Sequence, residues 1–109
     1  MLEVTFYRDE HERWRGMSAY GHVDFAEHGQ DIVCAAVSGI VQAARAGLEH
    51  YAGGELTLHQ NEGEFDLQIS ARGRDAESVQ AIITTAELAL SQLAGSYPEH
   101  VSVAHERIS

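Results

Sequence analysis

The chain has 109 residues, 44% of them hydrophobic, and seven basic residues oppose seventeen acidic ones for a formal net charge of −10. This length suits one domain with a single modest core, so we expect residues 1–109 to fold together. The negative charge repels phosphate backbones, which argues against direct nucleic-acid binding and favours a basic protein partner. A single cysteine, Cys34, excludes an internal disulfide and a Cys-rich metal site.

The location of the protein in the cell is predicted from two features that the sequence lacks. No apolar run in the sequence approaches the roughly 20 residues that cross a bilayer. The N-terminal segment 1–15 carries charges where a signal peptide has its apolar stretch. We therefore expect a cytoplasmic protein that does not contact a membrane.

The first part of the chain is predicted to form two strands. Leu2, Val4 and Phe6 alternate with polar neighbours, which predicts a strand with one side facing a core. Residues 8–13 are polar and predict a turn, and a second strand is predicted over about 14–21.

A long helix is predicted after a polar loop at residues 23–30. Asp31 is suited to be its N-cap, and Gly53 and Gly54 are suited to end it. Between them, apolar residues recur at helical spacing, namely Val33, Val37, Ile40, Val41, Ala44, Leu48 and Tyr51.

A β-hairpin is predicted next, because apolar residues alternate over 56–58 and over 65–69. The turn is expected near residues 61–63. A second amphipathic helix is predicted from about Asp75 to Ala94, where Gly95 and Pro98 are expected to end it.

A short last strand around Val101 and Val103 completes the order β-β-α-β-β-α-β. Two amphipathic helices can bury their apolar faces against the same side of a mixed sheet, so we expect a two-layer α+β sandwich. The alternation in the strands indicates that the other face of the sheet lies in water or in a dimer interface.

Cys34 is the first candidate for chemistry. If Asp31 caps the helix, Cys34 is the third helical residue, where free backbone N–H groups and the helix dipole favour an anion such as a thiolate. His22 ends the preceding strand, and the loop is long enough to return its imidazole to the sulfur, which would supply the base of a Cys–His pair. However, a cysteine between Val33 and Ala35 is more often a packing residue, so the spacing leaves both interpretations open.

The local sequence resembles a known family. Gly21-His22, followed by Gly29-x-Asp31-Ile32-Val33-Cys34-Ala35-Ala36-Val37-Ser38, closely resembles the signature of the Prp family, the bacterial ribosomal-processing cysteine proteases. The length and the predicted order of elements are similar as well. The resemblance implies that a dyad of Cys34 and His22 removes a short N-terminal extension from a large-subunit ribosomal protein. It also implies a homodimer, and the chemistry needs no metal or cofactor.

Three further residues match this motif. Asp31 can cap the helix, orient His22, or do both. Ser38 lies one turn beyond Cys34, where its hydroxyl can reach the neighbourhood of the thiol or bond the backbone one turn back. Gly21 either lets the chain approach a substrate closely or simply allows the strand to end. The free N–H groups at the start of the helix are natural donors to an oxyanion.

Other polar residues are interpreted without catalysis. The remaining histidines lack metal-ligand spacing and are interpreted as surface residues: His11, His28, His50, His59, His100 and His105. Trp14, between Arg13 and Arg15, is interpreted as a residue of an amphipathic strand, with a role at an interface as the alternative. Four acidic residues either form a solvated hairpin or attract a basic ribosomal-protein tail, namely Glu55, Glu62, Glu64 and Asp66.

The sequence thus predicts a cytoplasmic cysteine endopeptidase whose partner is the precursor of a basic large-subunit ribosomal protein. Two other classes stay open. One is a non-catalytic ribosome-assembly or binding module in which Cys34 only packs. The other is a redox-sensing protein in which Cys34 forms a sulfenic acid or an intermolecular disulfide.

Overall fold

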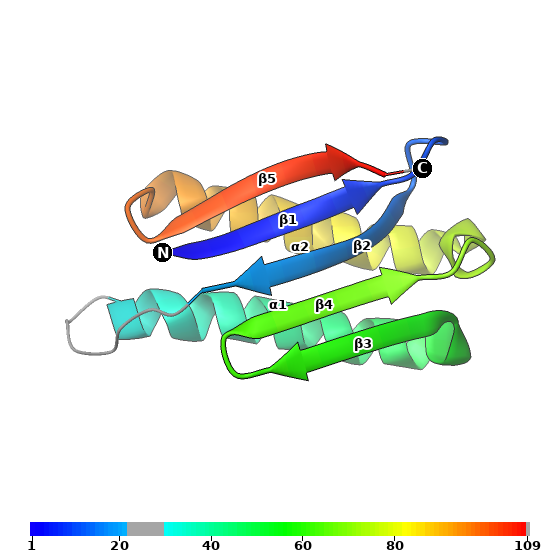
Figure 1. Ribbon diagram of the computed structural model, residues 1–109, viewed down its shortest axis with the longest axis horizontal. Helices are drawn as coiled ribbons and strands as arrows, with labels where there is room; N and C mark the ends of the chain where they lie inside the picture. The colour runs from blue at the N-terminus through cyan, green and yellow to red at the C-terminus, as the bar shows by residue number, and fades with distance from the viewer. Residues whose placement is uncertain (22–29, 109) are drawn as a thin grey trace.

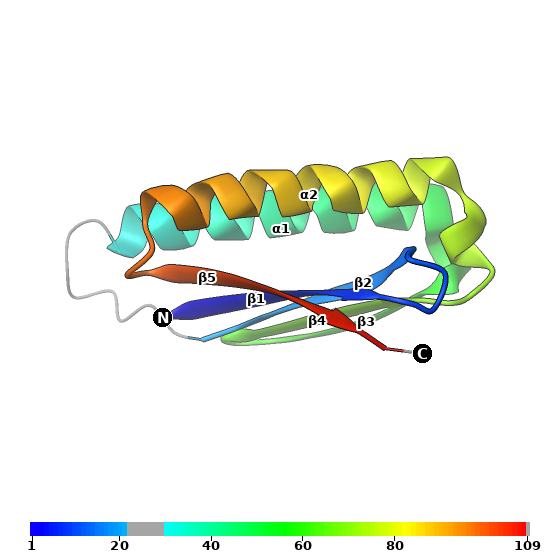
Figure 2. The same ribbon diagram turned by 90° about the horizontal axis from the view of Figure 1, so that it is seen from above.

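Two helices cover one face of a five-stranded sheet in the computed structural model, which describes residues 1–21 and 30–108 (Figure 1). The elements are β1 (Leu2–Arg8), β2 (Trp14–Tyr20), α1 (Gln30–Ala52), a 3-10 turn (Gly53–Glu55), β3 (Leu56–Asn61), β4 (Glu64–Ile69), a second 3-10 turn (Gly73–Asp75), α2 (Glu77–Ser96) and β5 (Val101–Arg107). Both helices lie on the same side of the sheet (Figure 2). The predicted order and the two-layer α+β sandwich are therefore confirmed.

The sheet has the order β3-β4-β2-β1-β5, and it is mixed because only β1 and β5 run parallel. The register places Val4 opposite Ala19 on β2 and opposite Val103 on β5. β5 is longer than the short strand predicted, because it pairs with β1 as far as Arg8 and Arg107. β3 and β5 are the edge strands.

The core lies between the sheet and the helices. Apolar residues at every second strand position meet the apolar stripes of both helices. The largest fully buried apolar side chains come from all of these layers: Phe6, Met17, Leu48, Leu67, Ile69, Ile83 and Leu90. The opposite face of the sheet is covered by none of the described elements, and Tyr7 there shares a hydrogen bond of 2.9 Å with Ser18.

The start of α1 differs from the prediction. The helix begins at Gln30, so Asp31 lies in its first turn and is not the residue that precedes it. Cys34 is accordingly the fifth residue of the helix, not the third. An acidic residue is favourable both at the N-cap and in the first turn, so residue type alone could not separate the two positions.

The boundaries of α2 also differ from the prediction. The helix spans Glu77–Ser96, because residues 73–75 form a separate 3-10 turn and Ala76 is extended. Gly95 lies inside the last turn and does not end the helix. The final hydrogen bond runs from the N–H of Tyr97 to the carbonyl of Leu93, at 2.9 Å.

By length and composition, residues 32–55 are apolar enough to cross a membrane, contrary to the prediction from the sequence. In the structure this segment lies largely in α1, which packs along the sheet. Its side chains at i, i+4 spacing, Val33, Val37 and Val41, are buried against the strands. The apolar character of the helix is thus partly accounted for by its position over the core.

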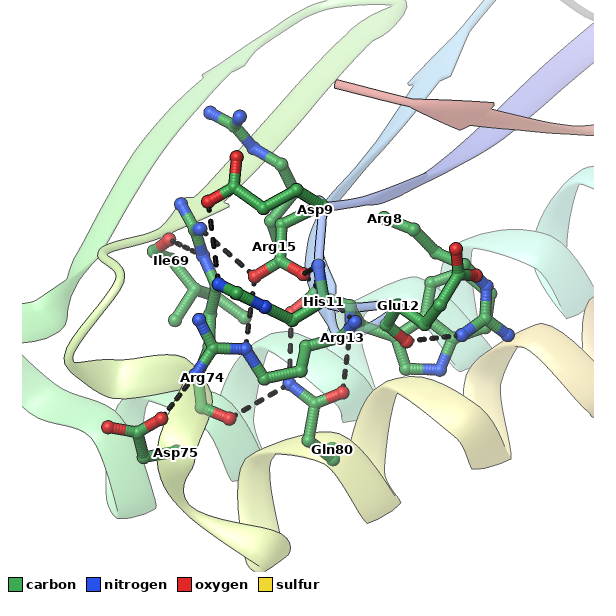
Figure 3. Close-up of polar contacts among 12 residues, drawn as sticks. Arg8, Asp9, His11, Glu12, Arg13, Arg15, Ile69, Arg74, Asp75 and Gln80 are labelled. Carbon is green, nitrogen blue, oxygen red and sulfur yellow. Dashed lines mark hydrogen bonds and ion pairs between the residues drawn. The ribbon is translucent and has the colours of Figure 1, made fainter. Parts of the chain in front are cut away.

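The turn between β1 and β2 is held by a buried carboxylate (Figure 3). Asp9 is 1% exposed and accepts hydrogen bonds from the backbone N–H of His11 at 2.8 Å and of Arg13 at 3.0 Å. The guanidinium groups of Arg13 and Arg74 donate to its other oxygen at 3.0 and 3.3 Å. Burial raises the pKa of Asp9, but these hydrogen bonds outweigh it and lower the pKa to about 2. The carboxylate therefore ties the β1–β2 turn to the segment after β4.

Trp14 is fixed by α2. Its backbone N–H donates to Oε1 of Gln80 at 2.8 Å, and Nε2 of Gln80 donates back to its carbonyl at 2.9 Å. The indole N–H donates to the hydroxyl of Thr84 at 3.0 Å, and the guanidinium of Arg8 lies 3.8 Å from the ring centroid. Trp14 is 4% exposed, so it is a core residue of its own domain and leaves almost no surface for an interface.

Candidate functional site

A cavity of about 250 Å³ opens between the first half of α1, the N-terminus of β1, the end of β2 and the tip of the β3–β4 hairpin. Apolar core side chains and polar side chains line it together. The residues are Leu2, Ala19, Gly21, Cys34, Val37, Ser38, Val41, Gln42, Gln60, Asn61, Glu62, Gly63, Glu64 and Phe65. The start of β1 and the β3–β4 turn lie at one end of the sheet, and the β1–β2 turn, to which Asp9 belongs, lies at the other end (Figure 1).

Cys34 lies at the border between this cavity and the core. Its side chain is half-buried, packs against the core cluster and also lines the cavity. The neighbouring Val33 and the next turn's Val37 are buried against the sheet. The thiol is thus neither sealed in the core nor fully exposed.

Ser38 and Gly21 line the same cavity as Cys34, and the roles predicted for them stay predictions. Gly21 has φ +122°, and its N–H donates to the carbonyl of Gly63 at 3.1 Å. A Cβ at this position would lie 2.3 Å from the carbonyl oxygen of Met1. The backbone therefore requires glycine here, which supports the interpretation that Gly21 lets the strand end and turn.

The structure gives little information on two of the predicted site residues. His22, the predicted base, lies outside the described residues, as does the loop that follows it. Asp31 is described only as part of the first turn of α1. The roles of both residues stay predictions, although Gly21, the residue directly before His22, lines the cavity.

Two glutamines in the cavity wall were missed from the sequence. Gln42 lies on α1 and Gln60 on β3, and Nη1 of Arg45 donates to the side-chain oxygens of both, at 3.3 and 3.1 Å. Nε of Arg45 donates to Glu49 at 2.9 Å. The i, i+3 and i, i+4 spacings on the helix could have indicated the contacts of Arg45 with Gln42 and Glu49, but not the contact with a strand.

The cavity has an acidic border. Glu62 and Glu64 line it, and none of its lining residues in the described part of the chain is an arginine or histidine. Partial burial and the carboxylates of Asp66 and Glu64 raise the pKa of Tyr20 at the end of β2. The attraction of the acidic border for a basic peptide stays a prediction.

The histidines in the described part of the chain do not gather with other ligands. Over residues 1–21 and 30–108, no three side chains of His, Cys, Asp or Glu lie together as a metal ion requires. His105 instead lies 3.0 Å from a carboxylate oxygen of Glu87 and stacks on Phe6.

Comparison of the sequence with known proteins identifies a family. A family model described as Cysteine protease Prp matches residues 1–102. The Ribosomal processing cysteine protease Prp of Mycoplasma pneumoniae is 32% identical over 91 residues, which are 84% of this chain and 87% of the relative. The protein of the same name from Bacillus subtilis is 28% identical over 109 residues, covering 94% of this chain and 96% of the relative.

Solved structures share the fold. SMU.848 from Streptococcus mutans has a TM-score of 0.85 at 28% identity and covers 99% of this chain and 96% of its own. An essential ribosomal processing protease Prp from S. aureus, solved with a substrate peptide, has a TM-score of 0.83 at 20% identity, with 96% and 99% covered. The S. aureus protein, at 20% identity, supports a shared fold only. The family model, in contrast, matches almost the whole sequence. The chain belongs to the Prp family of cysteine proteases.

Proposed function

We propose that this protein removes the N-terminal extension from the precursor of a basic large-subunit ribosomal protein, with Cys34 as nucleophile and His22 as base. The observation that carries the proposal is the position of Cys34, half-buried in a cavity that Gly21, the neighbour of His22, also lines. The family supplies the class of reaction. The relatives from Mycoplasma pneumoniae and Bacillus subtilis carry ribosomal processing in their names.

The chemistry follows from a thiolate beside an imidazolium. The sulfur of Cys34 attacks the scissile carbonyl carbon, a C–S bond forms, and backbone N–H groups at the start of α1 stabilise the oxyanion. As the C–N bond breaks, His22 gives its proton to the leaving amine. Water then loses a proton to His22 and attacks the thioester, which releases the new carboxyl terminus and restores the thiolate.

Three residues of the motif are proposed to support this dyad. Gly21 turns the chain from β2 into His22 with a backbone that a side chain would block. Ser38 borders the peptide one turn beyond Cys34. Asp31 stabilises the start of α1 through the helix dipole and is available to orient His22.

A cleavage assay tests the proposal. The purified protein is mixed with the ribosomal-protein precursor of its source organism, and the product N-termini are determined by mass spectrometry beside a Cys34→Ala variant. We expect one new N-terminus that the variant does not produce. Absence of cleavage by wild type, while Cys34 still reacts with iodoacetamide, would keep the reactive thiol but reject this precursor as its substrate.

We also propose that the protein acts in the cytoplasm as a homodimer, as the family resemblance implies. The open face of the sheet carries polar residues such as Tyr7 and Ser18. A groove between the outer sides of α1 and α2, about 370 Å³ in volume, is lined only by uncharged residues, among them Ile40, Ile82 and Ala89. Two copies with a charge of −10 repel each other least across such a surface. Sedimentation equilibrium should give twice the chain mass.

A further inference from the structure

We infer that the side-chain amides of Gln42 and Gln60 bind the backbone of the substrate peptide, and that Arg45 positions both of them. The inference rests on the proposed function, since it assigns the stretch of peptide that lies beyond the scissile bond. It concerns residues of the cavity wall that the predicted dyad and its supporting motif do not include.

The positions of these residues define a path for an extended peptide. Cys34, Ser38 and Gln42 follow one another at single-turn intervals on α1, and all three line the cavity. Gln60 lies on β3, within reach of the same arginine as Gln42. β3 is the edge strand, so no further strand flanks the cavity beyond Gln60, and the contact between Arg45 and Gln60 marks the far end of the path.

The helix geometry sets the distance along this path. Eight residues separate Cys34 from Gln42, which corresponds to about 12 Å along the helix axis. An extended peptide covers about 3.3 Å per residue. The two glutamines therefore lie about three to four residues from the bond that Cys34 would attack.

Arg45 determines which end of each amide is available. A guanidinium only donates hydrogen bonds, so the oxygens of Gln42 and Gln60 face Arg45 and their N–H groups point elsewhere. Glu49 accepts from Nε of Arg45 and so holds the guanidinium in place. Neither side-chain nitrogen has a hydrogen-bond partner among the described residues.

Backbone carbonyls are the acceptors that suit these donors. They occur at every position of an extended peptide, so two fixed amide donors can hold the substrate in register whatever its side chains are. Fixing the donors before binding also lowers the entropy lost on association. Gln42 and Gln60 would thus act on substrate binding and not on the chemical step.

Gln42→Glu and Gln60→Glu test this directly. Each variant keeps an oxygen for Arg45 but loses the amide N–H groups. If the amides bind the substrate, KM should rise about three- to tenfold in each variant while kcat stays the same. The new negative charge would by itself attract a basic substrate and lower KM, so a rise cannot be a charge effect.

Arg45→Met tests the positioning role, because it frees both amides without removing them. We expect a rise in KM of about threefold, and a smaller further effect of Gln42→Glu in the Arg45→Met background than in wild type. Gln92→Glu, at an exposed position of α2 outside the cavity, is the matched control and should leave KM unchanged. Thermal unfolding checks that each variant is folded.

The outcomes separate the inference from the proposed function. If wild type cleaves the precursor and both glutamate variants have the wild-type KM, the inference is wrong and the protease stands. A fall in kcat with KM unchanged would also overturn it, since the residues would then act on the chemical step. If wild type cuts no precursor at all, the proposed function fails first and the inference fails with it.

Discussion

The two ends of the sheet differ in how far their polar groups are hydrogen-bonded within the protein. At the Asp9 end, a buried carboxylate receives four hydrogen bonds from Arg13, Arg74 and the backbone of the turn (Figure 3). At the Cys34 end, half-buried Cys34 and the two glutamines Gln42 and Gln60 line a cavity. Polar groups that are satisfied internally stabilise the fold, whereas those with bonding capacity left are available to a substrate.

The charged side chains also differ between the two ends of the sheet. Six of the seven arginines lie at the end of β1, in the β1–β2 turn, at the start of β2, after β4 or at the end of β5: Arg8, Arg13, Arg15, Arg72, Arg74 and Arg107. Several are paired there with acidic side chains, as Arg107 is with Glu12. The hairpin tip at the other end carries Glu62 and Glu64 beside the cavity. We therefore expect substitutions at one end to affect stability and substitutions at the other to affect catalysis.

Cys34→Ala should produce the largest change in activity. Removal of the proposed nucleophile should lower kcat by at least about 10³-fold. The loss of one half-buried sulfur should change the free energy of unfolding by no more than about 1 kcal/mol. Cleavage kinetics and urea denaturation measure the two effects. A variant that retained activity would show that the cavity does not hold the nucleophile.

Asp9→Asn should produce the opposite pattern. It leaves two guanidinium groups without their carboxylate, so the free energy of unfolding should fall by about 3 kcal/mol. The kcat/KM of the folded fraction should stay near the wild-type value, because Asp9 is at the far end of the sheet. Glu10→Gln, at an exposed position of the same turn, is the control and should change stability by less than about 0.5 kcal/mol. Equal effects of the two substitutions would contradict the role of burial.

Gly21→Ala should affect both properties, because this residue belongs to the fold and to the cavity wall. With φ at +122° and the carbonyl of Met1 2.3 Å from the new Cβ, we expect a loss of stability of about 1–3 kcal/mol and slower cleavage. Gly39→Ala on α1 is the control, since nothing lies within 4 Å of its Cβ position. That variant should be more stable by about 0.5–1 kcal/mol. Unfolding midpoints and cleavage rates decide between the outcomes.

The sequence predicted those features that depend on local pattern. Alternation predicted the strands, helical spacing predicted α1 and α2, and the motif around Cys34 indicated the family. It did not predict the role of Asp9, because one of its partners, Arg74, lies 65 residues away. The contact between Arg45 and Gln60 was missed for the same reason, since only the packing of α1 beside the edge strand brings them together. Residue type also could not decide whether Asp31 precedes α1 or belongs to its first turn.

Acid should weaken the Asp9 end of the fold. The pKa of Asp9 is about 2 in the folded protein against an ordinary value of 3.8, so the charged carboxylate stabilises the fold. That contribution is complete above about pH 4 and is lost as the pH falls towards about 2. Urea denaturation at several pH values should therefore show a steeper loss for wild type than for Asp9→Asn over this interval. Parallel curves would mean that Asp9 is not the group responsible.

The smallest effect is expected from the acidic border of the cavity. The double variant Glu62→Gln and Glu64→Gln should raise KM about two- to fivefold at low ionic strength, because exposed charges attract a basic peptide only weakly. The difference should vanish near about 0.5 M salt, where the screening length is only a few ångströms.

A control variant with the same net charge separates the effect of where the carboxylates lie from the effect of the total charge of the protein. Glu10→Gln with Glu106→Gln removes two exposed carboxylates at the arginine-rich end. If KM rises only when the carboxylates beside the cavity are removed, the acidic border guides the substrate. If both double variants raise KM equally, the net charge of the protein is responsible and the position of Glu62 and Glu64 is not. If neither changes KM at low salt, the hairpin is a solvated surface and the attraction for a basic peptide is rejected.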